Sequence, residues 1–235
     1  AEHIGETARK GLPRIRQMFV LRGSGLDAAA FERKLFVIRK RVELQLRNEG
    51  IRGFHVPSLS CRTLVYKGLL LAYQVKKFYS DLADPAIESG LALVHQRYST
   101  NTWPTWDRAH PYRYLAHNGE INTVRGNHMW MRAREAVIRS GVWGDDIHKI
   151  MPLVAAGGSD SAMLDNALEF LVLSGRDLAH AMMMLIPEAW DHDPLMRDEK
   201  KAFYQYHQGL MEPWDGPASI AFTDGTRIAG VLDRN

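Results

Sequence analysis

Apolar residues recur at helical spacing in one long stretch near the start of the chain. Successive members are four, three, four and four residues apart, which places their side chains on one face of an α-helix. Asp27, just upstream, is a residue type favoured at a helix N-cap, and Asn48-Glu49-Gly50 is a typical end. We therefore expect a long amphipathic helix here, with an apolar face made by Phe31, Leu35, Ile38, Val42 and Leu46.

Other stretches have the composition of β-strands. Residues 15–21 are rich in apolar side chains and end at a glycine-rich turn. Residues 51–68 predict two strands around a turn at Ser58-Leu59-Ser60, and residues 91–94 predict a buried strand. Near the end, residues 217–222 and 226–232 predict a hairpin across Thr223-Asp224-Gly225.

Helices are expected in the middle of the chain. One covers about 122–139, one begins at Ser159 or Asp160 and carries Leu164 and Leu168 on one face, one is capped by Asp177, and one covers 200–211. Strands at both ends and helices between them do not form a strict βαβ repeat. The order indicates an α+β fold with largely antiparallel sheets.

Composition narrows the class of protein. The chain has 235 residues, of which 46% are hydrophobic and 24% charged, so it can bury a sizeable core. One cysteine, Cys61, excludes an internal disulfide framework and CxxC metal sites. Ten histidines show no HExxH spacing, so we expect no metal site. No apolar run is long enough to span a bilayer, and we expect no membrane partner.

Charge gives little indication of a partner. The net charge is +3, and the densest basic run, residues 33–47, includes Lys34, Arg39, Lys40 and Arg41. We interpret this run as the solvated face of the long helix, because no aromatic stacking set accompanies it as a nucleic-acid site would require. Cys61 lacks an obvious activating base, and we expect a small, mostly inert residue.

Two candidate site features lie between residues 91 and 123. Arg97 follows an apolar strand whose neighbours offer no partner for a guanidinium, although an arginine at a strand end is more often a surface residue or part of an ion pair. Asn118-Gly119 combines an amide donor with an accessible backbone N–H, the parts of an oxyanion hole, yet Asn-Gly is most often only a turn. Asp160 is a further candidate site residue, but the need for a cap at the start of the helix explains an aspartate at this position equally well.

Three motifs in order resemble the glutamine amidotransferase domain of the glutamate synthase large subunit. They are His95-Gln96-Arg97-Tyr98-Ser99-Thr100-Asn101-Thr102, His117-Asn118-Gly119-Glu120-Ile121-Asn122-Thr123 and Gly158-Ser159-Asp160-Ser161. Residues 58–68, 212–218 and 232–235 extend the resemblance over essentially all of residues 1–235.

This resemblance implies a class II, N-terminal-nucleophile amidotransferase with a four-layer αββα sandwich. Such a domain hydrolyses glutamine to glutamate and ammonia, using an N-terminal cysteine as nucleophile. The ammonia passes to a synthase domain of the same full-length chain, which makes glutamate from 2-oxoglutarate. The resemblance implies no cofactor in this domain, and FMN and an iron–sulfur cluster in the full-length enzyme. Implied partners are L-glutamine, the synthase domains, and a small electron-transfer subunit or ferredoxin. The expected location is the cytoplasm, with the plastid stroma as the alternative.

Roles carried over from the family fall on six residues. Arg97 would bind the glutamine α-carboxylate and Asp160 its α-ammonium, while Asn118 and the Gly119 N–H would hold the oxyanion. Thr100 and Asn101 would line the same pocket.

The departure from the family is that the chain begins at Ala1 rather than at the nucleophilic cysteine. Cys61 belongs to a different motif and has no free α-amine. Our expectation is a domain trimmed at both ends and inactive as it stands. The alternative is a cysteine-less amino-acid-binding or regulatory module of the same fold.

Overall fold

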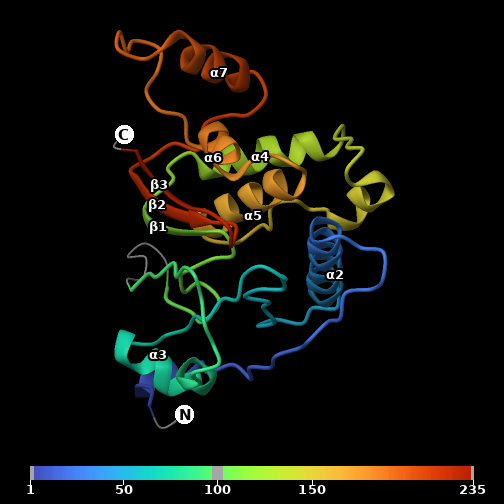
Figure 1. Ribbon diagram of the computed structural model, residues 1–235, viewed down its shortest axis with the longest axis vertical. Helices are drawn as coiled ribbons and strands as arrows, with labels where there is room; N and C mark the ends of the chain where they lie inside the picture. The colour runs from blue at the N-terminus through green and yellow to red at the C-terminus, as the bar shows by residue number, and fades with distance from the viewer. Residues whose placement is uncertain (1–2, 97–102, 234–235) are drawn as a thin grey trace.

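The computed structural model describes residues 3–96 and 103–233. Helices and one small sheet follow one another along the chain, with long irregular connections before the first strand (Figure 1). The elements are α1 (Glu6–Lys10), α2 (Ala28–Asn48), α3 (Ala72–Phe78), the 3₁₀ helix η1 (Ser80–Ala83), β1 (Leu115–Gly119), α4 (Val124–Glu135), the 3₁₀ helix η2 (Gly144–Ile150), α5 (Asp160–Leu173), α6 (Leu178–Leu185), α7 (Asp198–Gln208), β2 (Ala218–Thr223) and β3 (Ile228–Asp233).

The sheet is antiparallel and has the order β1-β2-β3. The predicted hairpin near the end of the chain is confirmed as β2 and β3, and β1 pairs with β2 in a register that places Leu115 opposite Phe222 and His117 opposite Ile220. Alternate residues of a strand face opposite sides of a sheet, so these four side chains share one face. That face and the helix α5 enclose the main core, in which Leu164, Leu168 and Leu115 are fully buried.

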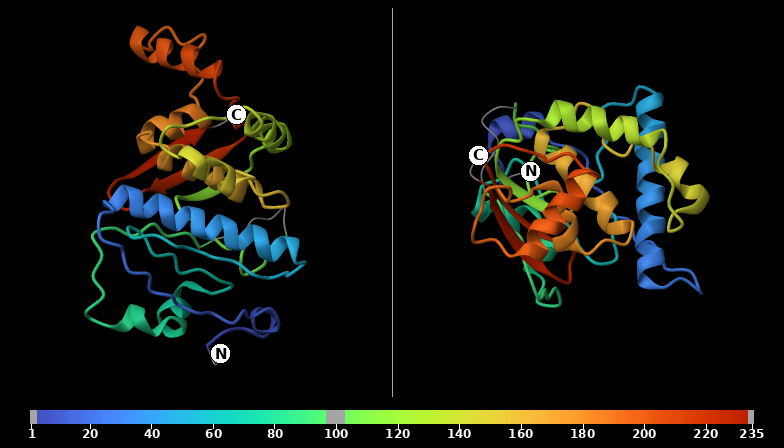
Figure 2. Two further views of the ribbon diagram at one scale, coloured as in Figure 1. Left: turned by 90° about the vertical axis from the view of Figure 1, so that its right-hand side faces the viewer. Right: turned by 90° about the horizontal axis from the view of Figure 1, so that it is seen from above.

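The long helix α2 lies along one side of the molecule, at a height between the sheet and the end that carries α1 and α3 (Figure 2). Asp27 caps it as expected, its carboxylate accepting from the Ala30 N–H at 2.6 Å. The predicted apolar face is only partly correct. Phe31 and Leu35 are buried, but Ile38 and Val42 are about 40% exposed.

The buried face of α2 is rotated because it contains two cations. Arg39 is 3% exposed and donates to Glu169 of α5 at 2.6 Å, and Lys40 is 7% exposed and donates to the Leu153 carbonyl at 3.1 Å. Our interpretation of the basic run as a wholly solvated face is therefore wrong for these two residues. The spacing of apolar residues could not reveal these buried cations, because their partners Glu169 and Leu153 lie more than a hundred residues away in the chain.

A second, smaller cluster of buried hydrophobic residues lies at the end of the molecule opposite α7 (Figure 1). Trp106 packs against Ile4 and Ala8, and its indole N–H donates to the Ala8 carbonyl at 3.0 Å. Gly68 lies under the ring: a Cβ placed there would be 2.3 Å from the Trp106 side chain. A glycine is thus needed for this contact.

The strands predicted in residues 15–21, 51–68 and 91–94 are wrong. The structure has no strand in these ranges, and no described strand pairs with them. β-propensity expresses how a residue fits a pleated, half-covered surface, and these stretches have no such surface beside them. The described residues therefore show helices on one antiparallel sheet, and the four-layer αββα arrangement stays a prediction.

Candidate functional site

The candidate oxyanion residues lie where β1 leaves the sheet. Asn118 and Gly119 are the last two residues of β1, and both are exposed. Gly119 has φ of 151°, and a Cβ there would lie 1.9 Å from the Pro217 carbonyl oxygen. No other residue could therefore occupy this position without moving the backbone.

The segment 212–217 continues the antiparallel pairing of β1 and β2 beyond the end of β1. A Cβ on Gly216 would lie 2.0 Å from the Glu120 carbonyl oxygen, just as one on Gly119 would meet Pro217. Backbone hydrogen bonds hold the two segments side by side: the Glu120 N–H donates to the Pro217 carbonyl at 2.8 Å, and the Asn122 N–H donates to the Asp215 carbonyl at 2.7 Å. This close contact gives a physical reason for a glycine in each of the two segments.

The Asp160 side chain contacts the loop that follows β1. Asp160 is the first residue of α5, whose N-cap is Ser159, one of the two residues that the sequence offered for this position. One carboxylate oxygen, Oδ2, accepts from the Ile121 N–H at 2.8 Å, and the other, Oδ1, lies 3.2 Å from the Ser161 hydroxyl. The side chain is 18% exposed. Capping is therefore the task of Ser159, and the Asp160 carboxylate is directed to the loop after Asn118.

His117 lies beside this carboxylate inside the core. Its Nδ1 is 2.8 Å from the Ser161 hydroxyl and 3.8 Å from Asp160 Oδ2, and its side chain is fully buried. Burial lowers the pKa of His117, against the opposing effects of the Asp160 carboxylate and the Pro217 carbonyl, so the imidazole is neutral at pH 7. Asn118 is next along β1 and therefore faces the other side of the sheet, with Ser219.

A second buried contact fixes the start of α5. The Tyr112 hydroxyl lies 2.7 Å from the Ser159 hydroxyl, and the Lys67 ammonium lies 4.6 Å from the centre of the Tyr112 ring. Lys67 donates to the Asp107 carbonyl at 2.7 Å, and burial lowers its pKa to about 7. Both Tyr112 and Lys67 are more than nine-tenths buried. Together they anchor the residue that precedes Asp160.

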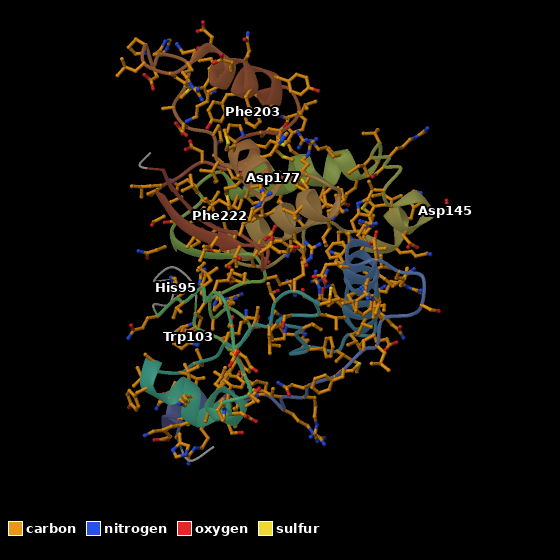
Figure 3. The ribbon with its side chains drawn as sticks, in the orientation of Figure 1. His95, Trp103, Asp145, Asp177, Phe203 and Phe222 are labelled. Carbon is orange, nitrogen blue, oxygen red and sulfur yellow. The ribbon has the colours of Figure 1, made fainter. Side chains whose placement is uncertain are left out.

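The structure brings together only part of the predicted site. Asp160 contacts Ile121, three residues after Asn118, so these two parts of the site converge on one loop. Arg97, Thr100 and Asn101 lie outside the described residues. His95 and Trp103 flank that gap in the chain, and both lie on the side of the sheet away from α7 (Figure 3).

Sequence reasoning missed the residues that support the carboxylate. His117 and Ser161 stand inside the quoted motifs, but we assigned them no role. Their signal was present, because the residue before Asn118 in a strand with one buried face must itself face inward. A histidine at such a position requires a polar partner. Tyr112 and Lys67 carried no comparable signal.

Cys61 is a poor nucleophile. Its thiol is exposed and lies 3.8 Å from the Ala28 carbonyl. Burial of the sulfur and the nearby Glu32 carboxylate raise the pKa of this thiol above its ordinary value. At neutral pH it is therefore protonated, and the expectation that Cys61 is mostly inert agrees with this environment.

The described part of the chain contains no group of three or more His, Cys, Asp or Glu side chains placed to hold a metal ion. Among the same residues, no helix combines the length and apolar character that a membrane crossing needs.

Residues 1–235 match the family model described as glutamine amidotransferases class-II, and the chain belongs to this family. The comparison also indicates a particular branch. The chain is 58% identical to the glutamate synthase [NADPH] large chain of Bacillus subtilis over 233 residues. This match covers 99% of the chain and 15% of the Bacillus subtilis protein. The chain is also 45% identical over 232 residues to the NADPH enzyme of Azospirillum brasilense and 43% identical over 242 residues to the ferredoxin-dependent glutamate synthase of Pyropia yezoensis. The chain thus spans about 15% of the length of these relatives.

Proposed function

We propose that this chain is the glutamine-hydrolysing domain of a glutamate synthase large chain. The observation that carries the proposal is the placement of Asp160. Its carboxylate accepts from the Ile121 N–H, two residues after Gly119, so the anion lies close along the chain to the exposed Asn118-Gly119 pair. An amino acid with a side-chain amide requires such a pair at its two ends.

The site residues divide the substrate between them. Asp160 accepts from the α-ammonium, Arg97 pairs with the α-carboxylate, and Thr100 and Asn101 line the pocket between them. Asn118 and the Gly119 N–H stabilise the negative charge that develops on the amide oxygen during attack. The nucleophile is a cysteine thiol with a free α-amine as base, a requirement that Cys61 does not meet.

The rest of the reaction belongs to other domains. Ammonia released here would pass to a synthase domain that carries FMN and an iron–sulfur cluster, where it would convert 2-oxoglutarate to glutamate. The named relatives use NADPH or ferredoxin, and this domain's residues do not select between electron donors. We propose the four-layer αββα sandwich for the complete domain, and the cytoplasm or the plastid stroma as its location.

Calorimetry with L-glutamine on the 235-residue chain tests the binding half of the proposal. We expect glutamine to bind, and Asp160→Asn to weaken binding at least tenfold, because it removes the charge that faces the α-ammonium. Asp177→Asn is the matched control, since Asp177 also stands at the start of a helix, but after the far end of α5. Equal affinity of Asp160→Asn and wild type would refute the role of Asp160.

The chemical half requires the nucleophile. Fusing a cysteine-first segment, taken from the Bacillus subtilis relative, ahead of Ala1 should give release of ammonia from glutamine. In that protein, Asn118→Ala should reduce the rate about 10²–10³-fold, the usual effect of losing one oxyanion donor. Ammonia release by the unfused chain that Cys61→Ser abolishes would contradict the proposed chemistry.

An amino-acid-binding or regulatory module of the same fold is the second candidate. Glutamine binding by the chain, combined with an inert but folded cysteine-first fusion, would support this module over the enzyme.

A further inference from the structure

Ser161 lies between two acceptors and has a single proton to donate. Its hydroxyl is 2.8 Å from His117 Nδ1 and 3.2 Å from Asp160 Oδ1. Ser161 is 4% exposed, so bulk water does not compete with these two acceptors for the hydroxyl proton. Where this proton goes decides whether Asp160 Oδ1 is already occupied when a ligand arrives.

The position of His117 is otherwise an apolar one. Its neighbours on the same face of the sheet are Leu115 and Ile220, both buried in the main core. A buried imidazole costs free energy unless its nitrogen atoms find partners, and an aliphatic side chain here would avoid that cost. Its Nδ1 is directed at Ser161, which indicates that the histidine is needed for that contact rather than for packing.

The surroundings of the ring favour one tautomer. A Cβ on Gly119 would lie 1.9 Å from the Pro217 oxygen and 2.9 Å from His117 Nε2, so both atoms border the small space that the glycine leaves. Among the described residues no atom completes a hydrogen bond with the buried Nε2, but the Pro217 carbonyl acts on the ring from that side and favours a proton on Nε2, so that Nδ1 is an acceptor. Ser161 can therefore donate to His117 instead of Asp160.

We propose that His117 and Ser161 are a positioning pair that keeps Oδ1 of Asp160 open for the α-ammonium of the substrate. This inference rests on the proposed function, because it deepens the role of Asp160. With the Ser161 proton turned to His117, the Ile121 N–H holds Oδ2 and Oδ1 keeps its lone pairs. With a proton on Nδ1, Ser161 would instead donate to Oδ1 and compete with the ligand.

The same geometry sets a limit at low pH. A protonated imidazole would place a cation 3.8 Å from Asp160 Oδ2, where it would compete with the ammonium for the carboxylate. The titratable groups that influence the ring are Asp160 of α5 and, from the segment before β1, His95 and His110.

The decisive experiment is a pair of substitutions assayed by calorimetry with L-glutamine. His117→Leu removes the alternative acceptor, so Ser161 should turn to Asp160 and glutamine affinity should fall about tenfold, the size of one competing hydrogen bond to a charged group. The double variant His117→Leu/Ser161→Ala removes the competing donor as well, and affinity should return to within about threefold of wild type. A role in packing alone predicts no such recovery.

Two controls isolate the ammonium. Glutaramate, which is glutamine without its α-amino group, should bind wild type and His117→Leu equally. His207→Leu makes the same change at another buried histidine, on α7, and should leave glutamine affinity unchanged. If the double variant binds no better than His117→Leu, or if glutaramate shows the same loss, the positioning pair is refuted.

A measurement on the unaltered chain covers the case in which His117→Leu does not fold. Nitrogen-15 NMR of the His117 ring should report a protonated Nε2 and a bare Nδ1, and a protonated Nδ1 would overturn the inference. Failure of the proposed function gives a different result, namely that wild type does not bind glutamine. Binding that depends on Asp160 while the double variant shows no recovery refutes the positioning pair alone.

Discussion

The two regions on either side of residue 115 bury their apolar side chains to very different extents. In the sheet-bearing region, residues 115–233, Leu115, Leu168 and Ile220 are at most 2% exposed. In the leading region, residues 3–96 and 103–114 apart from α2, Met18, Phe19 and Leu21 are 80% or more exposed. Both regions contain apolar runs of similar composition, so composition does not cause the difference.

What separates the regions is the presence of a partner. Residues 218–223 and 228–233 are joined by a short turn and pair at once, and α5 covers one face of the sheet they form. Residues 13–22 have no strand beside them, and no amide of this stretch donates to another described backbone carbonyl. An apolar run becomes a strand only where a ladder and a covering layer are supplied.

The helix α2 belongs to the first half of the chain but is fixed to the sheet-bearing region by charge. Arg39 pairs with Glu169 of α5 and with Glu43, and Arg113 reaches Glu43 at 3.3 Å and lies 3.8 Å from Asp165. Most of these groups are buried, where an unpaired charge is costly. Breaking this network should therefore damage the contact between the regions most.

Glu169→Leu should lower the free energy of unfolding by about 3–5 kcal/mol, because it leaves the Arg39 guanidinium buried without its closest partner. Urea unfolding of the 235-residue chain measures it. The double variant Arg39→Met/Glu169→Leu removes both charges and should recover most of the loss. A loss below 1 kcal/mol for Glu169→Leu would mean that charge does not hold α2 in place.

Leu168→Ala tests the sheet-bearing region itself. Leu168 is fully buried between α5 and the sheet, and truncation of such a leucine costs about 2–5 kcal/mol through lost burial and the cavity left behind. The same urea experiment measures it, with Leu195→Ala as control because Leu195 is 90% exposed. Equal effects of the two changes would remove the contrast in burial.

Acid should loosen the leading region. Burial lowers the pKa of His55 to about 2 and that of His110 to about 3, below the ordinary value of about 6.5. Between pH 6.5 and pH 3 the unfolded chain binds protons that these native histidines do not. The free energy of unfolding therefore decreases as the pH is lowered from 6.5 to 3, by at most about 1.4 kcal/mol per pH unit for each histidine.

The dependence of the unfolding free energy on pH can be assigned to His110 by comparing wild type with a variant. Unfolding free energies of wild type and His110→Gln at pH 7, 6 and 5 should converge as pH falls, because the variant lacks the titrating group. Comparing the two proteins removes contributions from other sites such as Asp165, whose pKa is raised to about 6 by burial. Parallel slopes would show that His110 has the same pKa in the native and the unfolded state.

The smallest effect is expected at Phe19. This side chain is 89% exposed, and Phe19→Ala should change the free energy of unfolding by less than about 0.5 kcal/mol. Hydrogen exchange measured by mass spectrometry should show rapid exchange over residues 13–22 and strong protection in α5. Protection of residues 13–22 comparable to that of α5 would contradict the comparison of the two regions.

Local signals were sufficient for part of the fold. Asp27 and Asp177 each cap the helix that the sequence assigned to them, Ser159 caps α5 as one of two predicted candidates, and the β2–β3 hairpin lies where its turn predicts. These features depend on residues a few positions apart. The strands expected at 15–21, 51–68 and 91–94 depend on partners that local sequence does not specify.

The candidate site divides in the same way. The motif containing Asn118 and that containing Asp160 could be recognised from sequence, and the structure directs both to the loop after β1. An inward-facing His117 could be inferred from its place before Asn118, but its partner Ser161 and the contact of Tyr112 with Ser159 could not, because these contacts join residues more than forty positions apart. A pairing of strand and helix faces must be known before such contacts can be inferred.

The mutual contact of Gly119 and Gly216 restricts how the site can adapt. Each glycine gives up its side-chain volume to a carbonyl of the other segment, so the two antiparallel segments lie closer together than side chains would allow. Moving the end of β1 would therefore require residues 212–217 to move with it. We expect the backbone around Asn118 and Gly119 to keep its shape when a ligand arrives, so that the ligand adapts to the protein rather than the reverse.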